Sequence, residues 1–341
     1  MEKIYYNITN YFAEGDTKMK KIRKTMAVIL VFAMLFAAMG LSGSAVSGNI
    51  PDEVVAVSSE LAVAIEQEGI VLLKNEDNSL PLADKKINVF GAASVVPLMG
   101  GAGSGAITTH DPVYFYEALD EAGIAYNMEL MELYDKNCGG QEIPRSSSTV
   151  LNNLVQLMFA KSSIQEMNPA KLTDAVMQNA KAFSDTAVIV IGRTSAENSD
   201  LSPETLRLSD NEKAMVEKVT AAFSEVIVLF NIGNVMEMGF LDEYESIKAA
   251  AVIWIPGEFG MRAVAQMLNG DVNPSGRLAD TVAYSVYDHP STQNFGTYEY
   301  DGGEHYVEYQ EGIYVGYRYF ETFAKDKVQF PFGYGLSYTT F

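Results

Sequence analysis

Two acidic residues stand shortly after a stretch that predicts a buried strand. Residues 186–192, TAVIVIG, are almost continuously apolar, and Glu197 and Asp200 follow in a polar stretch. Open α/β sheets place their chemistry in loops at the carboxyl ends of parallel strands. A carboxyl group on such a loop acts as a general acid when a partly apolar setting raises its pKa. The alternatives are a solvated connection for the whole loop, and for Asp200 a cap on the following turn.

A glycine-rich stretch at residues 100–110, GGAGSGAITTH, is the second candidate. Its glycines would bring backbone N–H groups and the Ser104 hydroxyl close to a ligand, and the alternative is a plain surface loop. Gly101, Gly103 and Ala106 also satisfy a loose dinucleotide-binding pattern. That pattern requires a strand immediately before the glycines and a helix immediately after them. Neither is predicted here, so nucleotide binding is disfavoured.

A third stretch, WIPGEFG at residues 254–260, predicts a sharp turn from strand to helix. Glu258 would then lie in the first helical turn, where the helix dipole alone favours an acidic residue. We therefore expect a structural role for Glu258. No serine nucleophile motif of the G-x-S-x-G type occurs. The single cysteine, Cys138, and the three dispersed histidines predict neither a disulfide framework nor a metal site.

The composition is that of a globular protein with a sizeable core. Of the 341 residues, 48% are hydrophobic and 20% are charged, and the formal net charge is -20. A surface this acidic repels phosphate backbones, which argues against nucleic acid as a partner. It suits a neutral substrate.

The N-terminus has the three-part layout of an export signal. Residues 19–46 begin with basic side chains, continue with an apolar run over 26–39 and end in small residues. That run is short for a membrane-spanning helix, which needs about 20 residues. The uncharged stretch nevertheless extends to Pro51, so an uncleaved anchor is the alternative to a cleaved signal. Both predict a domain outside the cytoplasm, either secreted or membrane-anchored.

From residue 55 onward, helix-like and strand-like patterns alternate. Continuous apolar runs without alternation are typical of strands buried on both faces. They predict an α/β fold, a mostly parallel sheet flanked by helices, preceded by a hydrophobic leader helix. Ser209 and Glu212 predict a capping box at the start of one helix. The strands are expected at 86–92, 186–192, 225–233 and 249–257, and the helices at 57–75 with Ser58 or Ser59 as N-cap, 113–123, much of 141–183, 209–223 and 258–270.

The tail from Tyr284 onward is rich in Tyr, Gly and Phe and has few helical repeats. We predict that it forms a long, packed extension of the same domain. The expected organisation of the chain is an unassigned leader at 1–18, a signal peptide or membrane anchor at 19–46, a tether at 47–57 and one domain at 58–341.

Six stretches, taken together and in order, resemble glycoside hydrolase family 3, the β-glucosidase and β-xylosidase type enzymes. The resemblance runs from about residue 58 to the end of the chain and implies the (α/β)6-sandwich domain of that family. The stretches are EGIVLLKNEDNSLPL (68–82), GGAGSG (100–105), GRTSAENSDL (192–201), GDVNPSGRL (270–278), YQEGIYVGYRYFET (309–322) and FPFGYGLSYTTF (330–341).

The resemblance implies roles for particular residues and no cofactor. Glu197 falls where the family has its general acid/base, although Ala196 and Asn198 replace the glycines that usually flank it. The other implied roles are sugar binding by Gly103, Ser104 and Gly105, and support of the acid by Arg193 and Asp200.

Family members of this kind pair the sandwich with a (β/α)8 barrel that supplies the nucleophilic aspartate in a motif like S-D-W. No S-D-W occurs here, and a barrel needs about 250 residues, which this chain cannot hold beside the sandwich. The order of motifs resembles the subgroup in which the sandwich precedes the barrel. We therefore expect a missing barrel downstream and a chain that is part of a longer enzyme.

The predicted function is that of the acid/base module of a retaining β-glycosidase, inactive alone. Its substrate would be a β-linked oligosaccharide or glycoside with a terminal glucosyl or xylosyl residue. The alternative is a non-catalytic carbohydrate-binding or scaffold protein that keeps the sandwich. A nucleotide-binding α/β domain is a third, disfavoured interpretation.

Overall fold

The computed structural model describes residues 51–101, 111–139, 164–193, 201–296, 298–300 and 302–339. The chain divides into two compact units, residues 1–54 and 55–341, and the fold below is that of the second unit. The predicted leader at 19–46 lies outside the described residues. Among the helices of the described ranges, none is both long and apolar enough to cross a membrane.

A six-stranded sheet forms the centre of the domain, with strand order β1-β6-β5-β4-β2-β3. Neighbouring strands are parallel except for β1, which pairs antiparallel with β6. This confirms the predicted, mostly parallel sheet. Its strands are β1 (Val71–Asn75), β2 (Lys86–Phe90), β3 (Ala125–Tyr126), β4 (Thr186–Arg193), β5 (Glu225–Ile232) and β6 (Ile247–Val252).

Both faces of the sheet are buried, as the continuous apolar runs predict. All eight residues of β4 are buried. Their side chains alternate between two hydrophobic clusters, so that Ile189 and Ile191 face one cluster while Val188 and Val190 face the other. A strand covered on both sides has no solvent face, which is why its sequence lacks the polar positions of a half-exposed strand.

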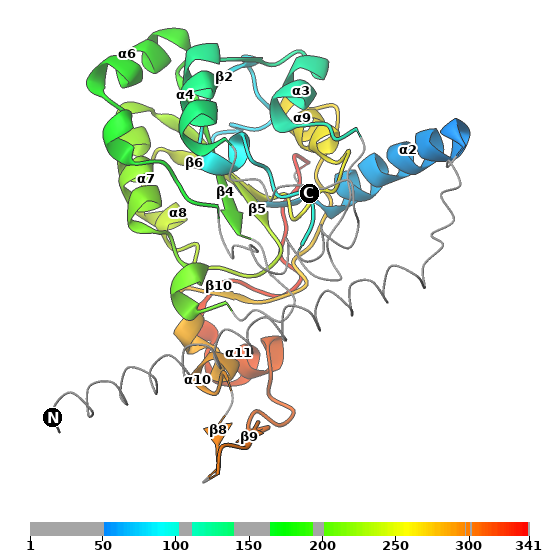
Figure 1. The fold of residues 1–341 in the computed structure, drawn as a ribbon, viewed down its shortest axis with the longest axis vertical. Coiled ribbons are helices and arrows are strands. Elements are labelled where there is room, and N and C mark those ends of the chain that lie inside the picture. The colour runs from blue at the N-terminus through cyan, green and yellow to red at the C-terminus, as the bar shows by residue number, and fades with distance from the viewer. Residues whose placement is uncertain are drawn as a thin grey trace, which may run out of the picture. The chain divides into compact units, whose positions relative to one another are not determined.

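Helices cover the two faces of the sheet (Figure 1). One cluster contains side chains from α4, α6 and α7, and the other contains side chains from α3 and α9. The helices of this part are α2 (Asp52–Gly69), α3 (Phe115–Glu121), α4 (Met128–Cys138), α6 (Asp174–Phe183), α7 (Asp210–Ala222), α8 (Phe240–Glu243) and α9 (Met261–Asn269), with short 3-10 turns η1 (Ala92–Ser94), η3 (Pro169–Lys171) and η4 (Pro203–Leu206).

Several predicted boundaries need correction. The strand predicted at 249–257 is β6, which spans Ile247–Val252 and ends early because Trp254 has a positive φ of 42°. Helix α2 begins at Asp52, before Ser58 and Ser59, because Asp52 and Glu53 suit the positive end of the helix dipole. The same predicted helix also contains β1, whose first residues are fully buried in the sheet. Glu258 lies in the turn before α9 rather than in its first helical turn, because Pro256–Gly260 forms a hydrogen-bonded turn of its own.

The region predicted as helical from 141 to 183 is only partly so. Residues 174–183 form α6, but 164–168 are not helical, and 140–163 lie outside the described residues. Pro169 begins η3, a single short turn. Its position agrees with the preference of proline for the first turn of a helix.

The tail is packed at its end and exposed in its middle, which corrects the prediction of a packed extension. Leu336 donates its backbone N–H to Leu72 O (2.7 Å), whereas residues 298–318 are almost all exposed. Acidic residues and glycines interrupt every apolar run in that middle part, so it cannot bury a continuous face. The tail contains β7 (Val282–Ala283), η5 (Val286–Asp288), α10 (Pro290–Gln293), β8 (Tyr298–Glu299), β9 (His305–Tyr306), α11 (Tyr317–Phe323), η6 (Lys325–Lys327) and β10 (Val328–Phe330).

The predicted capping box of α7 is present. Ser209 Oγ accepts the backbone N–H of Glu212 (3.3 Å), and Glu212 Oε2 accepts the backbone N–H of Ser209 (2.7 Å). Two of the unpaired N–H groups at the start of a helix are thereby satisfied.

Replacing Ser209 with Ala tests this cap. We expect Ser209→Ala to lower the free energy of unfolding by about 1 kcal/mol, because one backbone N–H loses its acceptor. Ser209→Thr, which keeps a hydroxyl, is the matched control and should lose less. Urea unfolding of the 341-residue chain measures both, and equal losses for the two variants would contradict the capping role.

Candidate functional site

The carboxyl ends of β4 and β5 meet at one edge of the sheet, where Gly192 lies opposite Asn231 and Arg193 opposite Ile232. The predicted acid loop leaves β4 at this edge. The predicted catalytic and sugar-binding residues lie outside the described residues, and their roles stay predictions. They are Glu197 and Asp200 in one loop, and Gly103, Ser104 and Gly105 in the other. The structure shows how the flanks of both loops are held.

Arg193, the last residue of β4, is buried and uses all five of its N–H donors. Its Nη1 and Nη2 donate to Glu212 Oε1 (2.7 Å) and Oε2 (2.6 Å) as a bidentate pair. The second Nη1 hydrogen goes to Gly192 O (2.7 Å). The remaining two donors go to Thr205 O from Nε (2.8 Å) and to Arg207 O from Nη2 (2.7 Å).

These contacts hold both flanks of the predicted acid loop. The loop 194–200 begins directly after Arg193, and the segment that follows it contains the two carbonyls, of Thr205 and Arg207, that the Arg193 guanidinium binds. A planar, always charged fork suits this task better than lysine would, because it can bind several acceptors in fixed directions. Arg193 is therefore a positioning residue for the flanks. Its predicted support of Glu197 itself stays a prediction.

A neighbouring buried amide holds the segment that leads to the glycine-rich loop. Asn231 is fully buried near the end of β5. Its Oδ1 accepts the backbone N–H of Leu98 (2.6 Å), and its Nδ2 donates to Leu98 O (3.0 Å) and to Trp254 O (2.7 Å). Asn231 was not among the site residues predicted from the sequence. The signal was available, since Asn231 is the one polar residue between Val226 and Ile232.

The far flank of the glycine-rich loop is held by Glu258. Its Oε1 accepts the backbone N–H of Asp111 (2.7 Å), and its backbone carbonyl accepts the N–H of Val113 (2.9 Å). The expected structural role of Glu258 is thus present, although its physical basis is this anchoring and not the helix dipole. Trp254, nearby in sequence, has a positive φ of 42° and donates its indole N–H to Gly69 O (2.9 Å). Positive φ is rare for such a bulky residue.

A buried carboxyl group lies close to the same edge. Glu166 is 8% exposed, and its Oε2 accepts the backbone N–H of Ala92 (2.8 Å), just after β2. Burial raises the pKa of Glu166 to about 7, and the charge of Glu212 adds to the rise, while the Ala92 N–H opposes it. Sequence reasoning missed Glu166 because it stands in a region with a helical pattern.

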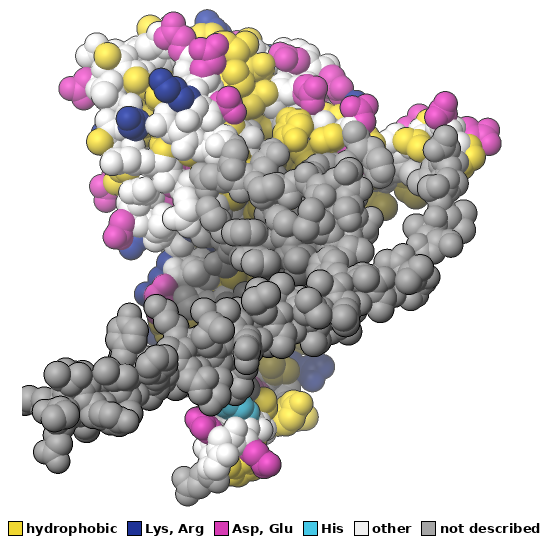
Figure 2. Space-filling view, in the orientation of Figure 1, with side chains coloured by type: hydrophobic (Ala, Val, Ile, Leu, Met, Phe, Trp, Pro, Cys, Tyr) yellow, Lys and Arg dark blue, Asp and Glu magenta, His cyan; other side chains and the backbone are white. Residues whose placement is uncertain are grey.

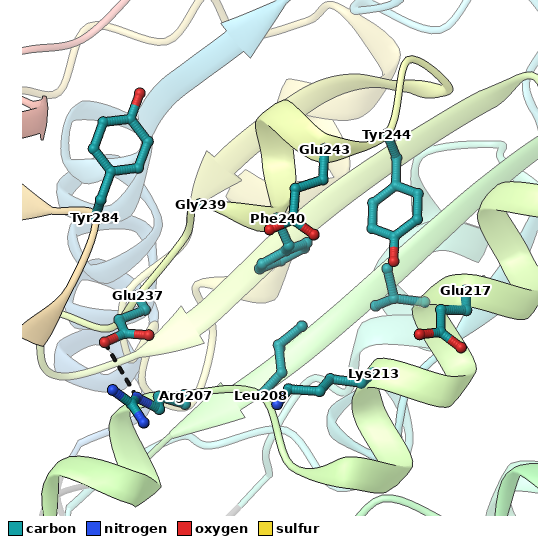
Figure 3. A pocket seen from close by; sticks show the side chains of 11 residues that line it. Arg207, Leu208, Lys213, Glu217, Glu237, Gly239, Phe240, Glu243, Tyr244 and Tyr284 are labelled. Carbon is teal, nitrogen blue, oxygen red and sulfur yellow. Dashed lines mark ion pairs between the residues drawn. The ribbon is translucent and has the colours of Figure 1, made fainter.

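The described residues contain two pockets near these elements. One, of about 590 Å³, lies beside Gly233–Val235, which follow β5, and beside 201–206, which follow the acid loop. The other, of about 330 Å³, lies beside α7 (Figure 3). In the second pocket Arg207 pairs with Glu237 at 3.2 Å, and Lys213 and Glu217 add further charges of both signs, which does not suit a neutral ligand.

The described residues show no arrangement for metal or thiol chemistry. Within them, no group of three or more His, Cys, Asp or Glu side chains is placed to hold a metal ion. Burial raises the pKa of Cys138 to about 12, so its thiol is protonated at neutral pH and is a poor nucleophile.

A mostly parallel sheet with helices on both faces, and with loops anchored at the carboxyl ends of its strands, defines an α/β domain of the kind that binds ligands at that edge. Comparison with known proteins narrows the class. The chain belongs to glycosyl hydrolase family 3, because the Glycosyl hydrolase family 3 C-terminal domain matches residues 70–317.

Relatives of known name agree with this assignment. A β-glucosidase of Ruminococcus albus is 38% identical over 286 residues, covering 83% of this chain and 28% of that protein. β-Glucosidase A of Butyrivibrio fibrisolvens is 37% identical over 309 residues, covering 83% of this chain and 35% of that protein. The crystal structure of a Paenibacillus barengoltzii β-glucosidase superimposes with a TM-score of 0.72 at 38% identity, covering 83% of this chain and 30% of that one. The chain thus spans about a third of the length of these relatives.

The Arg193–Glu212 pair generates a prediction about stability. Arg193→Met should lower the free energy of unfolding by about 3–5 kcal/mol, because it leaves the Glu212 carboxylate buried without its partner. The double variant Arg193→Met/Glu212→Gln should lose less than the single variant, since it removes the orphaned charge. Urea unfolding followed by the fluorescence of Trp254, the single tryptophan, measures both. Strictly additive losses would contradict the pairing.

Glu166 generates a prediction about pH. An unfolded glutamate releases its proton near its ordinary pKa of 4.5, whereas folded Glu166 holds it until about pH 7. Between these values the folded state binds more protons, so the contribution of Glu166 to stability falls as the pH rises. As the pH rises from 5 to 7.5, we expect the free energy of unfolding to fall less in Glu166→Gln than in the wild type. The difference between the two should be at most about 3 kcal/mol.

Burial also raises the pKa of Glu66, to about 8, so Glu66 contributes to the pH dependence of the wild type as well. Comparing variants isolates the contribution of Glu166. Glu132→Gln, at an exposed position of α4, is the matched control and should keep the wild-type slope. Identical slopes for the wild type and Glu166→Gln would show that Glu166 does not titrate in this range.

Proposed function

We propose that this chain is the acid/base-bearing α/β module of a retaining β-glycosidase. The observation that carries the proposal is the bidentate, fully bonded Arg193, which holds both flanks of the loop that contains Glu197. A general acid needs a fixed position relative to the bond that breaks, and a loop clamped at both flanks supplies it. Membership of glycosyl hydrolase family 3 supports the reaction class.

The proposed mechanism uses two carboxyl groups about 5–5.5 Å apart. One attacks the anomeric carbon and forms a glycosyl-enzyme while Glu197 protonates the leaving oxygen. Glu197 then removes a proton from the water that hydrolyses this intermediate. The nucleophile would come from a second domain, which agrees with the two thirds of the relatives' length that this chain does not span. The proposed substrate carries a terminal β-linked glucosyl or xylosyl residue, and the β-glucosidase names of those relatives support the glucosyl one.

We also propose that the domain acts outside the cytoplasm. The support is the basic, apolar and small-residue pattern of residues 19–46. Fractionation of cells that produce the full chain tests this: recovery in the cytoplasmic fraction would contradict it.

Pairing the chain with a second domain tests the catalytic proposal. The partner is the part of the Ruminococcus albus β-glucosidase that this chain does not match, fused or co-produced. The 341-residue chain alone should release no nitrophenol from a nitrophenyl β-glucoside, whereas the co-purified pair should. Glu197→Gln should lower kcat of the pair by about 10²–10⁴-fold, because the leaving oxygen loses its proton donor.

The matched control is Glu204→Gln, a nearby glutamate that accepts the Tyr287 hydroxyl (2.9 Å). It should keep the activity of the pair. Turnover by the chain alone, or full activity of Glu197→Gln, would overturn the catalytic proposal. A pair that co-purifies and hydrolyses nothing would favour the non-catalytic scaffold instead.

A further inference from the structure

Residues 298–317, which we call the tyrosine arm, carry an unusual surface. The arm contains six tyrosines and five acidic residues but no lysine or arginine. Five of its six tyrosines are exposed, Tyr300 by 56% and Tyr309 by 96%, and Tyr306 is half-buried. Contiguous exposed apolar surface of this kind marks a binding site in a soluble protein.

The first half of the arm is a small hairpin, at the end of the domain beyond α10 and α11 (Figure 1). Its strands β8 and β9 are two residues each, with Tyr298 opposite Tyr306. The ring of Tyr300 stacks on that of Tyr306 with centroids 4.2 Å apart, and the Tyr298 ring lies 5.4 Å from Tyr306. A two-stranded hairpin is marginally stable alone, so we ascribe its order to these ring contacts.

The charge of the arm restricts its partner. The arm's five acidic residues outnumber the one adjacent basic side chain, Arg318, which lies over the Tyr317 ring. The arm therefore disfavours anions and a second copy of a chain whose net charge is -20. On the face shown in Figure 2, acidic side chains are scattered over the described surface with fewer basic ones between them. The groups that the arm offers to a neutral ligand are the faces of its aromatic rings and the carboxylates beside them. Sugar C–H groups pack on aromatic faces, and sugar hydroxyls donate to carboxylates.

The arm also continues from a pocket wall. Phe295 and Thr292 line the 590 Å³ pocket at the carboxyl end of β5, next to the segment that follows the acid loop. The Tyr298 hydroxyl donates to Asn294 Oδ1, and Asn294 Nδ2 donates to Glu308 O (2.8 Å), which ties both halves of the arm to that wall. A chain of sugars lying in the pocket would therefore reach the arm.

We propose that the tyrosine arm binds a neutral β-linked oligosaccharide that extends from the 590 Å³ pocket at the carboxyl end of β5. The inference rests on the proposed glycosidase function for the identity of the sugar. The aromatic faces supply the contact area and the carboxylates accept sugar hydroxyls. The arm thus selects longer, uncharged substrates over short or anionic ones.

Titration of the 341-residue chain with cellotetraose, followed by calorimetry, tests the proposal without turnover. We expect measurable binding that Tyr300→Ala/Tyr309→Ala weakens by about fivefold or more. Tyr284→Ala, an exposed tyrosine outside the arm, is the matched control and should bind like the wild type. An anionic tetragalacturonate should not bind. Thermal unfolding verifies that each variant is folded.

The outcomes separate this inference from the catalytic proposal. Suppose that binding depends on the arm but Glu197→Gln leaves the activity of the two-domain pair unchanged. This result would support sugar binding by the tyrosine arm and overturn the acid/base role of Glu197. No binding of cellotetraose, or equal affinity in all variants, would overturn the arm alone. Sedimentation of a wild-type dimer that the arm substitutions dissociate would assign the surface to a second copy and also overturn it.

Discussion

The Arg193 guanidinium is the constraint on which the candidate site depends. Taking a charge out of water is costly unless every donor finds an acceptor, and Arg193 meets that condition with one carboxylate and three backbone carbonyls. Those acceptors lie on β4, on the segment after the acid loop and on α7. One buried charge therefore fixes three elements to each other at the sheet edge, and Glu212 serves both this pair and the helix cap.

Asn231 does for the glycine-rich loop what Arg193 does for the acid loop, with an amide in place of a charge. It binds both the N–H and the carbonyl of Leu98, as the backbone of a neighbouring strand would, and so ties the segment after η1 to β5. Because β4 and β5 are parallel neighbours in register, the two anchors lie at the same edge of the sheet, with Arg193 on the face covered by α7 and Asn231 on the opposite face. The topology thereby anchors, at one edge of the sheet, segments that flank residues 102–110 and residues 194–200.

Much of the fold could be predicted from the sequence, because strands buried on both faces and a capping box have strong local signatures. The runs ending at Gly192 and Gly233 mark β4 and β5 within a residue. The buried Glu166 could not be found so, since its burial depends on tertiary contacts that leave no periodic trace. The start of α2 had a local signal, the acidic pair Asp52 and Glu53. Asn231 was visible as a polar interruption, but its partners Leu98 and Trp254 are distant in sequence.

The clamp at both flanks of residues 194–200 has an evolutionary consequence. Arg193 binds the carbonyls of Thr205 and Arg207, so the bonds that fix the two ends of this stretch are made by the flanking segments themselves. Substitutions between the two ends need not alter these bonds. Selection could therefore change specificity by substitutions within residues 194–200 while the bonds of Arg193 at the edge of the sheet stay the same.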